Sequence, residues 1–102
     1  MRRYLLTEEA HNDLAEIRDY LKHEAGAQVA KTALGRIKAA IRFLSRTPGA
    51  GHIREDLTDH PVKFWPVMSY LLVYNPESHP IEIIRVIHGS REIAALLAKN
   101  DG

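Results

Sequence analysis

Five basic residues in the second half of the chain have the side chains best suited to chemistry. They are Arg54, Lys63, Arg85, His88 and Arg91. Guanidinium and ammonium groups stabilise phosphate oxygens, and an imidazole can give or accept a proton near neutral pH. Together these residues could form a cationic concavity. The free amides at the start of a helix after Gly89 would add to such an anion site.

A structural explanation stays open for the same residues. Arg85 could instead pair with an acid of the loop or of the chain end, namely Glu55, Asp56 or Glu92. Lys63 could be merely solvated. A lone histidine at the end of an apolar strand, such as His88, is more often a hydrogen-bonded structural residue than a proton carrier.

Other kinds of site find no support in the residue spacing. The chain has no cysteine and six histidines, and no two of these histidines lie three to five residues apart. A metal site would therefore need ligands from distant segments. The serines lack a nucleophile-elbow glycine pattern, and no phosphate-binding glycine loop is present. We expect neither a metal nor another cofactor.

The aromatic residues of the second half allow two interpretations. Phe64, Trp65, Tyr70 and Tyr74 could stack on unpaired bases, as rings do in nucleic-acid-binding proteins. Core filling is the better explanation for most of them. Alternation along the strand predicts that Phe64 and Trp65 face opposite sides, with one ring in the core and the other at least half exposed.

Length and composition indicate one small globular unit. The chain has 102 residues, 45% of them apolar, and a formal net charge of +1. This length suits one hydrophobic core, so we expect a single domain over residues 1–102. No apolar run approaches the roughly 18 to 20 residues that span a bilayer, and the N-terminal apolar stretch is too short for a signal peptide. We expect a cytoplasmic protein without a membrane partner.

The elements that must position these residues start with a strand over 2–6 and a helical hairpin. Apolar residues recur at helical spacing over 8–24 and 27–46, and Ala25-Gly26 is too short for any connection except an antiparallel one. The first helix carries six acids and two bases, and the second carries five bases and no acid. Complementary helix edges would explain this division. Alternatively, Lys31, Lys38 and Arg42 form a basic stripe for an acidic partner.

Three strands and a short helix follow a polar loop over 50–61. β-Branched and aromatic residues predict strands over 62–68, 70–74 and 81–88, and Pro66 confines the first of them to an edge or a bulge. The grouping of helices and strands predicts an α+β fold, with the helical hairpin on one face of a mainly antiparallel sheet. Exposed polar side chains should gather on the other face. In the last strand, Ile84, Val86 and His88 should point opposite to Ile83, Arg85 and Ile87.

Four segments in this order give the chain a resemblance to ParE/RelE-family toxins of bacterial type II toxin–antitoxin pairs. They are LAEIRDYL at 14–21, TPGAG at 47–51, YLLVY at 70–74 and IRVIHGSRE at 84–92. The last resembles the ending typical of the ParE branch. The resemblance implies a helical hairpin over a small antiparallel sheet. It also implies a hetero-oligomer with a neutralising antitoxin, for which Lys31, Lys38 and Arg42 would receive acidic side chains.

The branch of the family decides the implied target. ParE-like members poison DNA gyrase, and the resemblance then implies Arg85, His88 and Arg91 as the target-binding surface. RelE-like members cut messenger RNA on the ribosome without metal, often with a tyrosine late in the chain. The last tyrosine here is Tyr74, so the ending favours the ParE branch. The endoribonuclease alternative would use Arg54, Lys63, Arg85 and His88.

Overall fold

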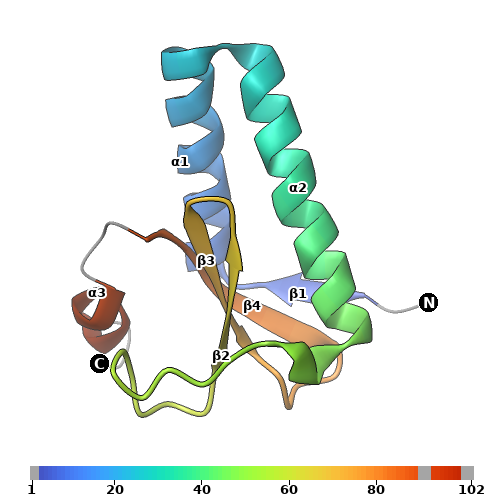
Figure 1. Ribbon diagram of the computed structural model, residues 1–102, viewed down its shortest axis with the longest axis vertical. Coiled ribbons are helices and arrows are strands. Elements are labelled where there is room, and N and C mark those ends of the chain that lie inside the picture. The colour runs from blue at the N-terminus through green and yellow to red at the C-terminus, as the bar shows by residue number, and fades with distance from the viewer. Residues whose placement is uncertain (1–2, 90–92, 100–102) are drawn as a thin grey trace.

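The elements follow the order that the sequence predicts. The computed structural model describes residues 3–89 and 93–99 (Figure 1). Its elements are β1 (Tyr4–Leu6), α1 (Glu8–Ala25), α2 (Ala27–Arg46), a 3₁₀ turn (Pro48–Ala50), β2 (Lys63–Val67), β3 (Tyr70–Asn75), β4 (Ile81–His88) and α3 (Ile93–Lys99). The α+β class is confirmed. None of the helices in the described residues is long and apolar enough to cross a membrane.

Local chemistry explains where α1 begins and ends. The Thr7 hydroxyl accepts a hydrogen bond from the Ala10 N–H at 3.0 Å, which satisfies one of the unpaired amides of the first turn. Gly26 ends the helix in the left-handed region, with φ of 97°, and donates its N–H to Lys22. α2 starts at the next residue, so the two helices form the predicted antiparallel hairpin.

The sheet has four strands in the order β1-β4-β3-β2. β1 pairs with β4 in parallel, whereas the other neighbours are antiparallel. A parallel pair needs a long crossover, and the helical hairpin supplies it. β2 forms the outer edge, as Pro66 predicts. Phe64 exchanges two backbone hydrogen bonds with His52 across this edge, and Pro66 has no N–H to offer there.

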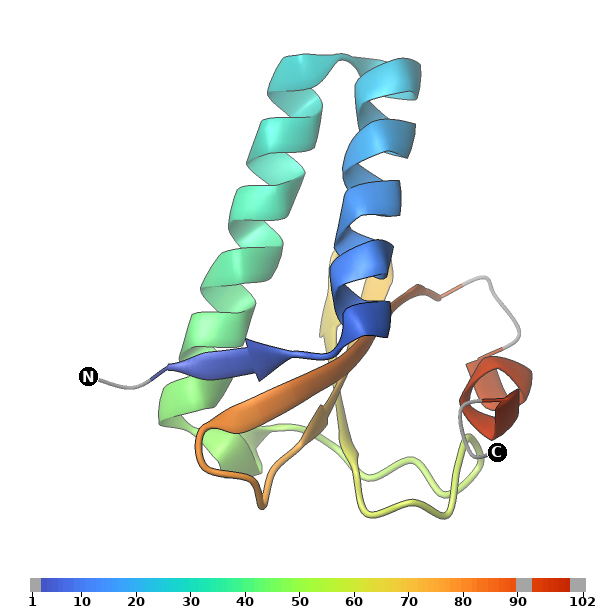
Figure 2. The same ribbon diagram turned by 180° about the vertical axis from the view of Figure 1, so that it is seen from behind.

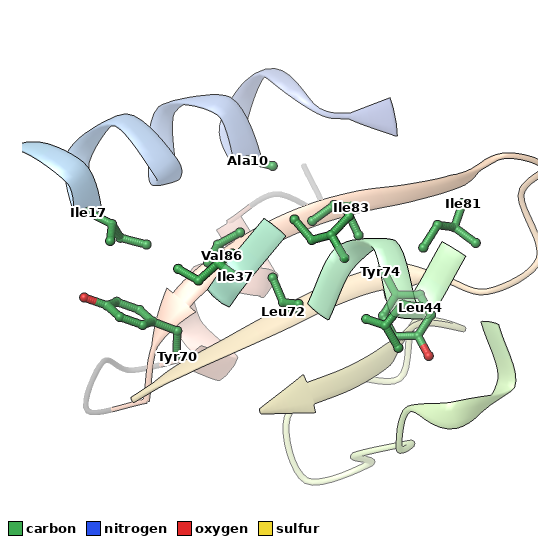
Figure 3. Packing of buried hydrophobic residues seen from close by; sticks show 11 residues of the cluster. Ala10, Ile17, Ile37, Leu44, Tyr70, Leu72, Tyr74, Ile81, Ile83 and Val86 are labelled. Atoms are coloured by element: carbon green, nitrogen blue, oxygen red, sulfur yellow. The ribbon is translucent and has the colours of Figure 1, made fainter. Parts of the chain in front are cut away.

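The main core lies between the helical hairpin and the sheet. α2 contributes Ile37, Ile41 and Leu44, which are fully buried against β3 and β4. Figure 3 shows side chains from both helices and both strands meeting in this layer. Tyr70, Leu72 and Tyr74 belong to the same cluster and therefore share one face of β3.

The opposite face of the sheet is covered, and the expectation that polar side chains gather there is wrong. A second apolar cluster contains Phe64, Val73, Ile87, Ile93 and Leu97. α3 and the loop that follows the 3₁₀ turn lie side by side over this face (Figures 1 and 2). Leu57 and Val62 of the loop pack against the cluster. The short C-terminal helix therefore closes a second, smaller core.

A β-bulge breaks the predicted alternation of β4. Val73 pairs with Arg85, but the next residue, Tyr74, pairs with Ile83, which leaves Ile84 as the extra residue. As a consequence, Ile83 and Val86 both lie in the main core, whereas Ile84 and Ile87 pack with the second cluster. The prediction that Ile84 and Val86 share a face is wrong because periodicity does not reveal a bulge.

Tyr74 fastens the end of α2 to the sheet. Its buried hydroxyl donates to the Pro48 carbonyl at 2.7 Å and accepts from the Gly51 N–H at 2.9 Å. Burial raises the pKa of Tyr74 above the ordinary tyrosine value. The TPGAG segment is thus held by one phenol from the middle of the sheet.

Alkali is expected to weaken the fold through this phenol. The pKa of Tyr74 is higher in the folded than in the unfolded state. The contribution of Tyr74 to the free energy of unfolding is therefore complete below about pH 10 and is lost as the pH rises through the folded-state pKa. Urea unfolding measured from about pH 8 to pH 11 should show a fall in the free energy of unfolding. The fall should be smaller in Tyr74→Phe, and an equal fall in that variant would contradict the assignment.

Candidate functional site

Arg85 is held by an ion pair with Asp13 of α1. Its Nε and Nη2 atoms donate to the two carboxylate oxygens of Asp13 at 2.8 and 3.0 Å. The side chains are only 14% and 10% exposed, respectively. A bidentate pair of this kind fixes the planar guanidinium in one orientation. Among the described residues Asp13, and not Glu55 or Asp56 of the loop, pairs with Arg85. Glu92, the third acid expected, lies outside the described residues.

The position of Asp13 follows from the way α1 continues the edge of the sheet. β1 stops at Leu6, so the later part of β4 pairs with β3 on one side and has no neighbouring strand on the other. The Thr7 hydroxyl donates to the Ile84 carbonyl at 2.7 Å, and Asp13 Oδ2 accepts the Val86 N–H at 2.9 Å. The side chains of Thr7, just before α1, and of Asp13, within α1, thus satisfy backbone groups that a strand would otherwise bond.

The surroundings of Arg85 are acidic. Hydrogen bonding to Asp13 raises the pKa of Arg85 most strongly, and the charges of Asp13, Glu9 and Glu16 add to the effect, while burial opposes it. All three acids lie on α1. The charge of Arg85 is therefore balanced within the chain, and a bare cationic concavity does not form around it.

His88 lies at the exposed end of β4, beside Arg85. Both residues line a hollow of about 340 Å³ together with Asp13, Glu16 and Tyr20 of α1. The His88 ring meets Tyr70 edge-on, with ring centroids 5.2 Å apart. The structure therefore brings two of the predicted target-binding residues to one accessible place. Arg91, the third, lies outside the described residues.

Arg54 and Lys63 do not join this hollow. Arg54 lies in the loop and donates two hydrogen bonds to Asp56, at 2.9 and 2.7 Å. The Lys63 ammonium contacts the Gly51 carbonyl at 3.4 Å, near the outer edge of the sheet. The four residues of the endoribonuclease alternative are thus divided between different parts of the surface.

A larger groove runs along the helical hairpin. It measures about 810 Å³ and has a floor of apolar side chains from β1 and both helices, namely Tyr4, Leu6, Leu14, Ala30 and Leu34. Its charged lining is exclusively basic: Arg18, Lys22, Lys31 and Lys38. We call this feature the helical groove. Its form suits an amphipathic segment with acidic side chains.

The helical groove divides the predicted basic stripe. Lys31 and Lys38 line it, whereas Arg42 does not. Arg18 and Lys22 were not part of the sequence prediction. Among the described residues no ion pair joins α1 to α2. Arg18 and His23 of α1 instead lie next to acids of the same helix, Asp19 and Glu24. Complementary helix edges thus form no direct ion pair within the described part of the chain, and both explanations of the charge division remain predictions.

Gly35 is unusual because no neighbour in the described part of the chain requires a glycine at this position. It lies in the middle of α2 and lines the helical groove, and a Cβ placed on it would meet no atom within 4 Å. Glycine inside a helix is less stable than alanine by about 1 kcal/mol. The open space is on the groove side, where a partner could approach the backbone closely.

We expect Gly35→Ala to raise the free energy of unfolding by about 0.5 to 1 kcal/mol, because it restricts the unfolded chain without a clash. Chemical denaturation of both proteins measures the difference. A destabilised variant would contradict the open space described here.

The comparisons with known proteins agree with this geometry. Residues 4–93 match the family model described as ParE toxin of type II toxin-antitoxin system, parDE. The chain belongs to the ParE toxin family. A solved chain described as the chromosomal ParDE TA system from P. aeruginosa superposes with a TM-score of 0.70 at 22% identity, covering 86% of this chain and 96% of that chain. It shows that the ParE chain here has the same fold. A search of curated proteins returned no match.

One residue of this ParE chain that the sequence analysis missed is Asp13, although a signal exists. Asp13 lies between Ala10 and Ile17 at spacings of three and four, so it falls on the buried stripe of α1. An acid on a buried stripe needs a partner. The natural candidates for that partner are the five basic residues Arg54, Lys63, Arg85, His88 and Arg91.

Proposed function

We propose that this ParE-family chain is the toxin of a type II toxin–antitoxin pair that poisons DNA gyrase, and that an antitoxin neutralises it by occupying the helical groove. The observation that carries the proposal is the match to the ParE family over residues 4–93. The apolar floor and purely basic lining of the helical groove support the antitoxin part.

The chemistry of the helical groove defines the partner segment. Apolar side chains of the antitoxin would bury against Leu14 and Leu34 and supply most of the affinity. Acidic side chains on both flanks would meet Arg18 and Lys22 on one helix and Lys31 and Lys38 on the other. Such charges mainly accelerate the encounter and orient the segment.

Gyrase is the preferred target because the residues of the endoribonuclease alternative are dispersed. Arg85 is neutralised by Asp13, and Arg54 by Asp56. Lys63 lies with Gly51, away from the hollow that Arg85 and His88 share. Stabilising a phosphorane-like transition state calls for cations that converge on one point. No observation favours RNA cleavage, so we carry only the gyrase proposal forward.

We expect the double substitution Lys31→Glu with Lys38→Glu to slow antitoxin binding by about tenfold or more at low salt, since it replaces two attractive charges by repulsive ones. Stopped-flow or surface-based kinetics with the antitoxin encoded beside this chain measure the rate. The matched control is Arg36→Glu with Arg46→Glu, which changes the net charge equally on the same helix outside the groove. Equal slowing in both pairs would remove the groove from the proposal.

Induced expression with two separate readouts tests the target. The proposal predicts gyrase-dependent DNA breaks, intact transcripts and growth arrest that antitoxin co-expression relieves. His88→Ala provides a further test. It should change the amount of gyrase-dependent DNA breakage without changing antitoxin binding, because His88 does not line the helical groove. Cut transcripts with unbroken DNA would refute the gyrase proposal.

A further inference from the structure

Three rings from different parts of the chain form a small array near the outer edge of the sheet. Trp65 of β2 lies between Phe43 of α2, at a centroid distance of 5.4 Å, and His52 of the loop, at 6.0 Å. The His52 and Trp65 planes are nearly parallel, 9° apart. We call these three residues the aromatic platform. Its two outer rings are exposed and its central ring is half-buried.

Packing accounts for the central ring but not for the outer two. Trp65 packs against the main core, so its position is explained by burial. Phe43 is 37% exposed, and His52 is tied to the sheet by its backbone, through two hydrogen bonds with Phe64, rather than by its ring. His52 is stacked on Trp65, whereas Phe43 is tilted against it by 36°. The exposed outer rings are available to a further planar group.

Cations surround the aromatic platform. Arg46 follows Phe43 by three positions and therefore neighbours it on the surface of α2, and Arg42 directly precedes it. Neither side chain makes an ion pair or a hydrogen bond with any other part of the chain that the structure describes. The Lys63 ammonium lies by the Gly51 carbonyl, next to His52 in the chain.

The aromatic platform is separate from the hollow that Arg85 and His88 share and from the helical groove. Neither of them is lined by Phe43, Trp65 or His52. Protein partners usually place an aromatic or apolar anchor in a pocket, whereas flat rings flanked by cations suit bases that stack and phosphates that pair. An acidic peptide would use the cations and leave the exposed rings without a role.

We propose that the aromatic platform binds single-stranded nucleic acid. Unpaired bases extend the stack at His52 and at Phe43, and Arg42, Arg46 and Lys63 take the phosphates. The site needs neither gyrase nor the antitoxin, so its failure would leave the proposed function untouched. The helical groove is separate, because none of the platform residues lines it.

Trp65 makes the test direct, because it is the only tryptophan in the chain. The full chain is titrated at low salt with an oligothymidylate of about 12 nucleotides while tryptophan emission is followed. We expect saturable quenching with an affinity that falls steeply as salt is added. Phe43→Ala and His52→Ala should each weaken binding by about fivefold or more, in line with the loss of one stacked base.

The controls separate stacking from simple charge attraction. Tyr20→Ala removes an aromatic ring that is 62% exposed on α1 and should bind like the parent chain. The His52 ring is exposed, so His52→Ala keeps the proposal testable even if Phe43→Ala unfolds. Absence of quenching, equal binding by both platform variants and the parent, or tighter binding of a glutamate-rich peptide than of the oligonucleotide would each overturn the proposal.

Discussion

Asp13→Ala is expected to lower the free energy of unfolding by about 3 kcal/mol. The substitution leaves the Arg85 guanidinium, 14% exposed, without its carboxylate. It also removes the acceptor of the Val86 N–H, which is buried at the edge of β4. Each of these losses leaves a desolvated group unpaired. An unpaired buried group lowers the free energy of unfolding by more than the loss of the hydrogen bond alone.

Urea denaturation of matched variants measures this effect. Asp19→Ala is the control, because Asp19 likewise pairs with an arginine, Arg18, but its side chain is 70% exposed. This control should lower the free energy of unfolding by no more than about 1 kcal/mol. The double variant Asp13→Leu with Arg85→Met should recover part of the loss, since it leaves no buried charge. If Asp13→Ala and Asp19→Ala cost the same, the ion pair does not hold α1 to the sheet.

Gly51→Ala is expected to lower the free energy of unfolding by about 2 to 3 kcal/mol, because the added methyl group overpacks the site. A Cβ on Gly51 would clash with the Tyr74 hydroxyl and would lie 2.8 Å from Tyr74 Cε1 and 3.0 Å from the Phe64 carbonyl. The Tyr74 side chain is fully buried and has no room to withdraw. The clash therefore breaks the hydrogen bonds of its hydroxyl to Pro48 and Gly51 as well.

Gly49→Ala provides the comparison within the same segment. A Cβ on Gly49 would meet nothing within 4 Å, so we expect a change within about 0.5 kcal/mol of the parent chain. Thermal melts of the two variants at one pH measure the difference. Equal melting temperatures would show that the phenol of Tyr74 does not fix the loop in the way described.

Local signals explain why so much of the fold could be predicted from sequence. The period of apolar residues predicted the two long helices, Ala25-Gly26 predicted the tight connection between them, and Pro66 predicted the edge strand. These features depend on neighbours within a few residues. The covered second face was not predictable in the same way, because it depends on where α3 and the loop return to the sheet.

The candidate site was harder to predict because it is assembled across the whole chain. Asp13 and Arg85 are 72 positions apart, and they meet because β1 is short and α1 takes over the edge of β4. The bulge at Ile84 could not be inferred from alternation. Lys31 and Lys38 were predicted from spacing on one helix, whereas Arg18 and Lys22 required the packing of the hairpin to be known.

Gyrase cleavage in a purified system tests the central proposal most directly. The full chain is incubated with gyrase, ATP and supercoiled plasmid, and linear DNA is measured after denaturation of the protein. We predict that linear DNA accumulates with the parent chain and disappears when the antitoxin is bound first. A plasmid that stays supercoiled and unbroken with a chain that is folded and still binds the antitoxin would contradict the account.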